Sequence, residues 1–177
     1  SGKTEAMKIF KKIGFVCICA DEIVHDLYKK NGEGAKKIEL VFGKKFINDD
    51  GLVKRKDLGE AVFNDENKLK LLNNIIHPLV YEEIRSLLDR NVGANIAIEA
   101  VYFDRNFLGD FVDKIIWIER PKDDIINVLV NERGFAQDLA EKVYQSIGET
   151  SEIDFTINND SDLISLSKQI EKFVTTC

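Results

Sequence analysis

The first four residues of the chain, Ser1-Gly2-Lys3-Thr4, are suited to phosphate chemistry. They match the last four positions of the phosphate-binding motif G-x-x-x-x-G-K-[ST]. Gly2 lets backbone N–H groups approach an anion, Lys3 can reach terminal phosphate oxygens, and the Thr4 hydroxyl suits Mg²⁺. A helix that starts here adds a dipole that favours negative charge. Taken alone, four residues favour a simpler interpretation, a tag remnant followed by an ordinary helix start.

A second candidate, Asp21, follows the continuous apolar run of residues 15–20. Such a run is typical of a strand buried on both faces, so Asp21 is predicted at the C-terminal end of a strand. Open α/β sheets bind their ligands at that edge, which makes this carboxylate a candidate for chemistry. Asp21 also suits the N-cap of a helix that begins at Glu22, and both roles can hold.

Two further candidates lie where helices are predicted to end or bend. Pro78 is expected to interrupt a helix, which places His77 at a helix junction. Arg133 lies near the bend of a predicted helical hairpin, where a mobile lid can place a cation over a phosphate. Each has a commoner structural role: His77 as a hydrogen-bonded structural residue, Arg133 as a solvated cation at a helix C-terminus. His25 is expected to be a surface or capping residue.

The elements that position these residues alternate between strands and helices. Strands are predicted over residues 15–20, 94–103, 113–119 and 155–157, and apolar residues at helical spacing occupy the segments between them. Residues 30–90 read as mostly helical, with a turn at residues 48–51, and predict a small subdomain of their own. This alternation predicts an α/β fold with a mostly parallel sheet covered on both faces.

Composition bounds the class of protein. The chain has 177 residues, of which 44% are hydrophobic and 32% charged, as in one soluble globular domain. The net charge of −6 argues against nucleic acid as the main partner. No apolar run approaches the roughly 20 residues that span a bilayer, so no membrane partner is expected. Three cysteines cannot all pair, and they favour a reducing cytoplasm over secretion.

The order of the motifs resembles the dephospho-CoA kinases, P-loop kinases of the nucleoside-monophosphate-kinase type. The matching features are the SGKT start, Cys19-Ala20-Asp21, the segment 50–58, Ile76-His77-Pro78-Leu79, Arg133 and Ile157-Asn158-Asn159. The resemblance implies a three-layer P-loop NTPase fold forming a single domain over residues 1–177. Within that domain, residues 30–90 would be a helical substrate-binding insertion and residues 121–148 a helical lid.

The resemblance also implies a reaction, the transfer of the ATP γ-phosphoryl group to the ribose 3′-hydroxyl of dephospho-CoA. ATP, dephospho-CoA and Mg²⁺ would be the small molecules bound, by a monomer or weak homo-oligomer. The family's residue roles carry over to matching positions as follows: catalysis by Asp21, Lys3 and Arg133; nucleotide binding by Gly2, Lys3, Thr4, Arg133 and Asn159; acceptor binding by Asp21, Arg55 and His77; Mg²⁺ binding by Thr4 and Asp21.

Several positions depart from the family pattern. Cys19 stands where the family usually has an aspartate, and Ala100 where it has a proline. Leu129 occupies the place of a common second lid arginine, no Lys or Arg lies between residues 145 and 153, and Asp104 replaces a glutamate. Fewer cations would then face the transition state, which predicts a divergent member with a slower or differently balanced site.

The family's first strand and the first half of its phosphate loop have no counterpart in these residues. Because that strand lies in the middle of the sheet, we expect the natural chain to contain it ahead of Ser1. Intact mass spectrometry checks this expectation, and a mass equal to that of the 177 residues would contradict it.

Three other interpretations remain open. A kinase for another small acceptor, such as a nucleoside monophosphate, would share Lys3, Thr4 and Asp21 but differ in the helical subdomain. A degenerate, non-catalytic nucleotide-binding or scaffold protein would account for the missing glycines and cations. A structural α/β domain without a site ranks last, because it treats the ordered motifs as coincidence.

Overall fold

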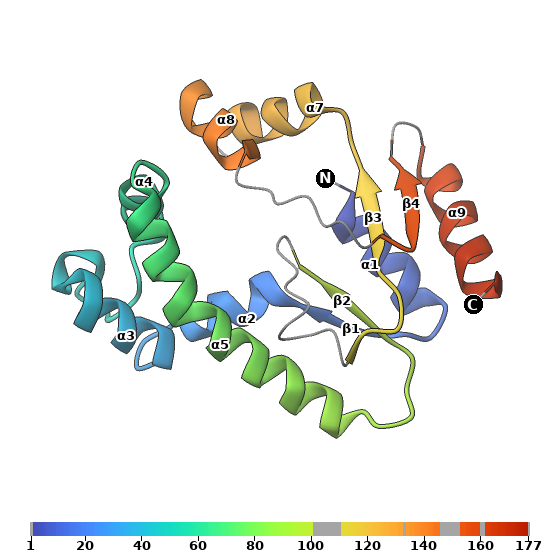
Figure 1. Ribbon diagram of the computed structural model, residues 1–177, viewed down its shortest axis with the longest axis horizontal. Helices are drawn as coiled ribbons and strands as arrows, with labels where there is room; N and C mark the ends of the chain where they lie inside the picture. Colours follow the sequence, from blue (N-terminus) through green and yellow to red (C-terminus); the bar gives the residue numbers. More distant parts are fainter. Residues whose placement is uncertain (1, 101–110, 133, 146–152, 160–161, 177) are drawn as a thin grey trace. The chain divides into compact units, whose positions relative to one another are not determined.

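The chain divides into two compact units, shown as a ribbon in Figure 1. One unit comprises Ser1–Ile18 and Gly93–Cys177, and the other Cys19–Val92. The structure is a computed structural model and describes residues 2–100, 111–132, 134–145, 153–159 and 162–176. Within that part of the chain, no helix combines the length and apolar character needed to cross a membrane. The prediction of one domain with an insertion over 30–90 and a lid over 121–148 stays a prediction.

The first unit contains strands and helices that follow one another along the chain. Its elements are α1 (Lys3–Lys12), β1 (Val16–Cys19, whose last residue belongs to the second unit), β2 (Ile96–Glu99), β3 (Ile116–Glu119), α7 (Lys122–Asn127), the π-helical turn η3 (Val128–Glu132), α8 (Gln137–Gln145), β4 (Phe155–Asn158) and α9 (Leu163–Thr176). The helix predicted after Thr4 and the four predicted strands are therefore present, although residues 101–103 of the second strand lie outside the described residues.

Among the described residues, the strands pair two by two. β1 pairs with β2, and β3 pairs with β4 in parallel, with Ile116 opposite Phe155 and Glu119 opposite Asn158. The ladder continues one residue past β4, because the N–H of Asn159 donates to the carbonyl of Glu119 at 2.9 Å. Parallel strands joined through helices confirm the predicted α/β class.

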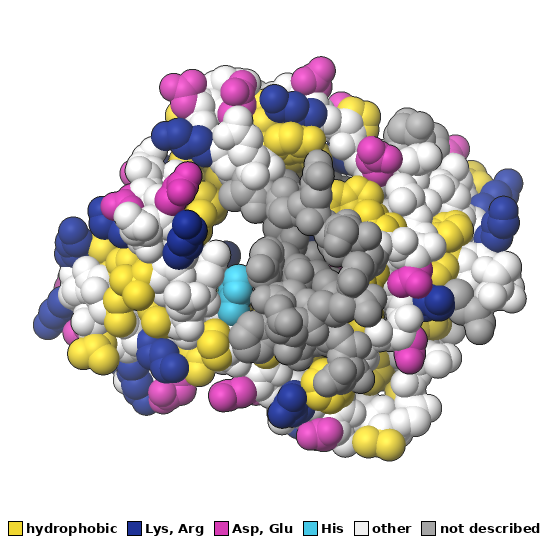
Figure 2. Space-filling view, viewed as in Figure 1, with side chains coloured by type: hydrophobic (Ala, Val, Ile, Leu, Met, Phe, Trp, Pro, Cys, Tyr) yellow, Lys and Arg dark blue, Asp and Glu magenta, His cyan; other side chains and the backbone are white. Residues whose placement is uncertain are grey.

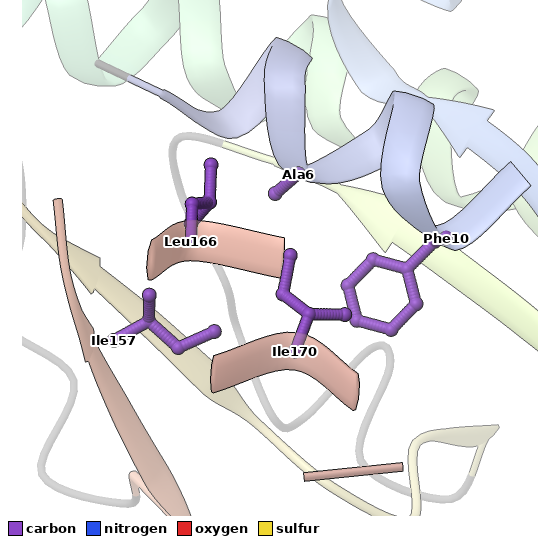
Figure 3. Packing of buried hydrophobic residues seen from close by; sticks show 5 residues of the cluster. All are labelled: Ala6, Phe10, Ile157, Leu166 and Ile170. Atoms are coloured by element: carbon purple, nitrogen blue, oxygen red, sulfur yellow. The ribbon is translucent and has the colours of Figure 1, made fainter. Parts of the chain in front are cut away.

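One buried cluster locks α1, β4 and α9 together. Figure 3 shows its members: Ala6 and Phe10 from α1, Ile157 from β4, and Leu166 and Ile170 from α9. Ile157 and Ile170 are 0% exposed. Both helical pairs are four residues apart, so each pair lies on one face of its helix. Burying each large aliphatic side chain contributes about 1.5–3 kcal/mol, which fixes these three elements relative to one another.

The helical pair predicted over residues 121–148 has a small core of its own. Ile126 and Leu129 pack with Ala140 of α8, and Leu129 is only 7% exposed. The apolar residue at position 129, which departs from the family pattern, therefore has a packing role. Arg133 and residues 146–148 lie outside the described residues.

The second unit is helical and is organised around one long helix. Its elements are α2 (Ala20–Leu27), α3 (Glu33–Phe42), the 3₁₀ turn η1 (Lys44–Phe46), α4 (Arg55–Phe63) and α5 (Glu66–Arg90). α5 contacts α2, α3 and α4. The predicted turn at residues 48–51 is present and ends at Gly51, whose φ of 79° favours glycine. The predicted helical character of this segment is therefore confirmed.

The predicted helix break at His77-Pro78 is wrong. α5 runs without interruption from Glu66 to Arg90 with Pro78 inside it. A proline within a helix removes one hydrogen bond and costs about 3 kcal/mol. On either side of it, Ile76, Val80 and Ile84 are buried at four-residue spacing, and each contributes about 1.5–3 kcal/mol. Tertiary packing therefore outweighs the local preference of proline.

Candidate active site

The phosphate-binding candidates lie at the N-terminus of α1. Gly2 is the N-cap, with a left-handed backbone at φ 87°, and Lys3 and Thr4 are the first two helical residues. The carbonyl of Gly2 accepts the first helical hydrogen bond, from Ala6 N–H at 2.9 Å. The N–H groups of the first turn lack helical partners and point outward from the helix end. This end of α1 can therefore accept an anion, with Lys3 half-buried and the Thr4 side chain exposed.

Asn159, from the other end of the sequence, packs against this helix start. A Cβ atom placed on Gly2 would lie 2.7 Å from Cγ of Asn159 and closer still to its Nδ2. A side chain at position 2 would be strained by the φ of 87° and would also require the Asn159 amide to shift, so glycine is favoured here. Two residues predicted to bind nucleotide are thus brought together within one unit.

Asp21 lies in the first turn of α2, directly after β1. The helix begins at Ala20 and its N-cap is Cys19, which makes no side-chain capping hydrogen bond. The prediction that Asp21 N-caps a helix starting at Glu22 is therefore wrong, because the strand leads into the helix without an intervening turn. The Asp21 carboxylate is exposed, and the helix dipole stabilises its negative charge.

Arg55 is the first residue of α4, and its side chain is exposed. Its neighbours Lys54, at the N-cap, and Lys56 add two more exposed cations to the same helix start. Cations at a helix N-terminus add to the positive end of the dipole, and Asp57 in the same first turn offsets part of this charge, so the helix start keeps a net positive charge that suits an anion. Figure 2 shows that Lys and Arg side chains are frequent over the α3 and α4 end of this unit.

Tyr28 connects α2 to the segment that carries Arg55. Its carbonyl accepts a hydrogen bond from Val53 N–H at 3.2 Å. Burial raises the pKa of the Tyr28 phenol to about 12, and the positive charge of Arg55 works in the opposite direction. The phenol therefore lies within electrostatic range of the guanidinium. Sequence reasoning missed Tyr28, because nothing in the local pattern distinguishes it from an ordinary helix-end residue.

His77 occupies the middle of α5 rather than a helix junction. Its ring lies 6.0 Å from the ring of Tyr81 in an edge-to-face arrangement, and the side chain is half-buried. The helix that carries it contacts both α2 and α4, which carry Asp21 and Arg55. The three predicted acceptor-binding residues thus belong to one unit, on α5 and on two helices that each contact α5.

Gln169 is a second residue that sequence reasoning missed. Its side-chain amide accepts from Asn158 N–H at 3.3 Å and donates to the carbonyl of the same residue at 3.1 Å. It therefore fixes the main chain one residue before Asn159. Its position on the predicted α9 was recognisable from the sequence, but its contact with β4 depends on how the helix packs.

Two of the remaining positions that depart from the family pattern lie at the ends of strands. Cys19 is the half-buried last residue of β1, and Ala100 is half-buried directly after β2. Asp104 and the predicted lid residue Arg133 lie outside the described residues. Within the described ranges, no group of three or more His, Cys, Asp or Glu residues is arranged to hold a metal ion.

A Gly-Lys-Thr helix start beside the end of a parallel strand pair, in an α/β fold, defines a class, the P-loop nucleotide-binding phosphotransferases. Two solved structures share the fold. The crystal structure of TT1252 from Thermus thermophilus has a TM-score of 0.73 at 17% identity, over 99% of this chain and 91% of the other. The dephospho-CoA kinase from Campylobacter jejuni has a TM-score of 0.58 at 24% identity, over the same shares of the two chains.

The family model of dephospho-CoA kinase matches residues 1–164, and this chain belongs to that family. A dephospho-CoA kinase of Fusobacterium nucleatum is 30% identical over 99% of this chain and 93% of its own length. One of Dehalococcoides mccartyi is 37% identical over 78% of this chain and 71% of its own. The predicted resemblance and the P-loop NTPase fold are confirmed, as is the prediction of a kinase.

Proposed function

We propose that this protein transfers the γ-phosphoryl group of ATP to the ribose 3′-hydroxyl of dephospho-CoA, giving CoA and ADP. The observation that carries the proposal is the family match over residues 1–164. Phosphoryl transfer needs little covalent participation by the protein, because most catalysis comes from positioning and from charge stabilisation. The chemistry proposed for each residue below follows from that requirement.

The start of α1 would hold the nucleotide. Its free N–H groups and dipole suit the phosphates, and the ammonium group of Lys3 would draw charge from the transferred phosphoryl group. Asn159 would lie beside the adenine, as the family resemblance implies. Arg133 would add a cation from the lid over residues 121–148. With Leu129 buried in the core of that lid, fewer cations would be available than the family pattern provides.

The second unit would hold the acceptor. Asp21 would accept the proton of the 3′-hydroxyl and orient its oxygen for attack, a role that suits an exposed carboxylate at a strand end. Arg55 and His77 would hold dephospho-CoA, whose phosphates are anions. The observation that supports Arg55 is the excess of exposed cations, Lys54, Arg55 and Lys56, over the acid Asp57 at the start of α4.

We propose Mg²⁺ as the metal cofactor. The Thr4 hydroxyl and the Asp21 carboxylate are hard oxygen donors, and both side chains are exposed. Mg²⁺ commonly binds through one or two protein oxygens together with substrate phosphates and water, so each of these two donors is of a type that suits the ion. When bound, the ion would neutralise developing charge on the phosphate oxygens.

We also propose a cytoplasmic protein that is a monomer or weak homo-oligomer and does not bind nucleic acid. The net charge of −6 supports the last point. The odd number of cysteines, three, supports a reducing compartment, because they cannot all pair within one chain.

A phosphoryl-transfer assay with a panel of acceptors tests the proposal. With ATP and Mg²⁺, dephospho-CoA should be phosphorylated and AMP and CMP should not be. Robust phosphorylation of AMP or CMP without turnover of dephospho-CoA would replace the proposal with a nucleoside monophosphate kinase. Calorimetric binding of ATP with no transfer to any acceptor would instead indicate a non-catalytic nucleotide-binding protein.

A further inference from the structure

We propose that Asn159 is a positioning residue for the phosphate-binding turn, and that its side chain holds Gly2 in the conformation from which α1 starts. The inference rests on the proposed function, because it concerns the same nucleotide site. It adds a role at the phosphate end to the contact with adenine that the family resemblance implies. It is carried by the contact between two residues at opposite ends of the chain.

The first step is the close approach of the two residues. Gly2 has φ 87°, a backbone conformation that side chains other than glycine rarely adopt. The amide of Asn159 lies on the side of Gly2 where a Cβ atom would project, with Cγ 2.7 Å from that position. The side chain therefore fills the space that the missing Cβ leaves, and it restricts how Gly2 can move.

The second step is the rigidity of the segment that carries Asn159. Its N–H donates to Glu119 on β3 at 2.9 Å, so residue 159 faces β3. The preceding residue, Asn158, is held from the other side by both ends of the Gln169 amide. The main chain is therefore hydrogen-bonded to β3 at residue 159 and to α9 at residue 158.

The third step is the placement of α1 itself. Ala6 and Phe10 of α1 pack against Ile157 of β4 and against Leu166 and Ile170 of α9. β4 and α9 therefore position both α1, which begins after Gly2, and Asn159, which contacts Gly2. Because both main chains are held in one register, the Asn159 side chain extends from a fixed position beside Gly2.

This role of Asn159 predicts an effect on binding of the nucleotide's phosphates rather than of its base. If Asn159 fixes the turn before Lys3 and Thr4, loss of its amide must weaken binding of any nucleoside triphosphate. If Asn159 only contacts adenine, loss of its amide must weaken binding of ATP and leave GTP unchanged. The two roles therefore predict different patterns across nucleotides, and calorimetric titration distinguishes them.

The experiment compares ATP and GTP binding to the full-length protein and to Asn159→Ala. We expect the dissociation constants of both nucleotides to rise by roughly threefold or more, within the range of coupling energies between contacting residues. Gln169→Leu, which removes both hydrogen bonds to Asn158, should weaken both nucleotides by a smaller factor. An unchanged affinity for GTP in Asn159→Ala would overturn the proposal.

The matched control is Asn158→Ala. This neighbour has the same side chain and is exposed, and its hydrogen bonds to Gln169 use the main chain. We expect no change in either dissociation constant. Thermal unfolding of each variant shows whether it is folded, so that a loss of binding is not a loss of structure.

A double-mutant cycle supplies a second test. Gly2→Ala introduces a Cβ that meets the Asn159 amide, so truncation of that amide in Gly2→Ala/Asn159→Ala should restore part of the lost affinity. If the double variant lost ATP affinity by the product of the two single-variant factors, the proposal would be overturned. ATP binding is measured here without dephospho-CoA. A wild-type protein that binds ATP but does not phosphorylate dephospho-CoA would therefore refute the proposed function alone.

Discussion

In the unit of residues 1–18 and 93–177, the candidate nucleotide-binding residues come from segments far apart in the sequence. In the unit of residues 19–92, the candidate acceptor-binding residues lie at the starts of two helices and in the middle of a third. Gly2 and Asn159 are held by strand pairing, helix packing and a side-chain amide. Asp21 and Arg55 instead project, exposed, from the first turns of α2 and α4.

This difference suggests that the first unit binds the nucleotide and the second binds the acceptor. A site fixed by many long-range contacts is rigid and can hold its hydrogen-bond donors at set positions around a triphosphate. Exposed side chains on helix starts retain rotamer freedom and suit a longer, flexible acceptor. Substitutions in the two units should therefore separate in their effects, the first on nucleotide affinity and stability, the second on turnover and acceptor affinity.

The sharpest separation should come from Asp21→Asn. The substitution keeps the size of the side chain and removes the base, so kcat for dephospho-CoA should fall by about 10²–10⁴-fold. Calorimetry should show ATP binding close to that of the wild type. Glu22→Gln, an exposed acid in the same helical turn, is the control and should remain active. Unchanged activity in Asp21→Asn would remove this residue from the mechanism.

The rigidity of the first unit can be broken through its core with Ile170→Ala. This side chain is 0% exposed and touches the cluster that joins α1, β4 and α9. Urea unfolding should show a loss of about 2–5 kcal/mol. Ile164→Ala on the same helix, at a side chain 64% exposed, should change stability by less than about 0.5 kcal/mol. Equal effects would show that α9 is not held by this cluster.

In the second unit, we expect stability at alkaline pH to depend on the ionisation of Tyr28. Burial raises the pKa of its phenol from 10.0 to about 12 in the folded protein. The unfolded chain ionises first, so this contribution is fully present below pH 10 and is lost as pH rises through about 12. The shift corresponds to about 3 kcal/mol of stability.

Urea unfolding of the wild type and of Tyr28→Phe, below pH 10 and close to pH 12, measures that contribution. Other groups that titrate in this range are common to both proteins and cancel in the difference. The wild type should lose more stability than the variant between the two conditions. Parallel losses would show that the phenol is not buried.

The smallest expected effect is that of Arg55→Ala. Loss of one charged hydrogen-bond donor should raise KM for dephospho-CoA about tenfold, with kcat and ATP affinity nearly unchanged. Lys56→Ala, at the next exposed position, should raise KM by less than about threefold. A loss of ATP affinity in Arg55→Ala would contradict the assignment of this residue to the acceptor.

Where the sequence pattern was local, it predicted the structure well. Apolar residues at three- and four-residue spacing located α3, α4 and α9, and β-branched runs located β1 and β3. Gly51 was expected in the turn over residues 48–51, and its φ is positive. These features depend on neighbouring residues alone, so a single sequence contains enough information to predict them.

Where several elements compete, local rules failed. Pro78 was expected to end a helix, but the buried face of α5 on both sides of it outweighs the lost hydrogen bond. Asp21 was expected at an N-cap, but the helix starts one residue earlier because β1 leads directly into it. Both errors concern positions at which packing decides between two conformations of similar local cost.

The sequence predicted which residues belong to the candidate site, but not which of them contact one another. The motif order identified Gly2 and Asn159 separately, while their contact depends on the register of β3 with β4 and on the packing of α9. Gln169 and Tyr28 carry no motif at all. The roles of the predicted catalytic and binding residues stay predictions, and Arg133 lies outside the described residues.

Gln169 has a further consequence for the behaviour of the protein in concentrated solution. Within the described residues, β4 has a hydrogen-bonded neighbour, β3, on one side only, so its other side is an open strand edge. Open edges recruit strands from other molecules and promote aggregation. The amide of Gln169 occupies the outward-facing N–H and carbonyl of Asn158, in the way that an added strand would. A strand from another chain would have to displace both hydrogen bonds before it could extend the ladder, so we expect Gln169 to disfavour pairing at this edge.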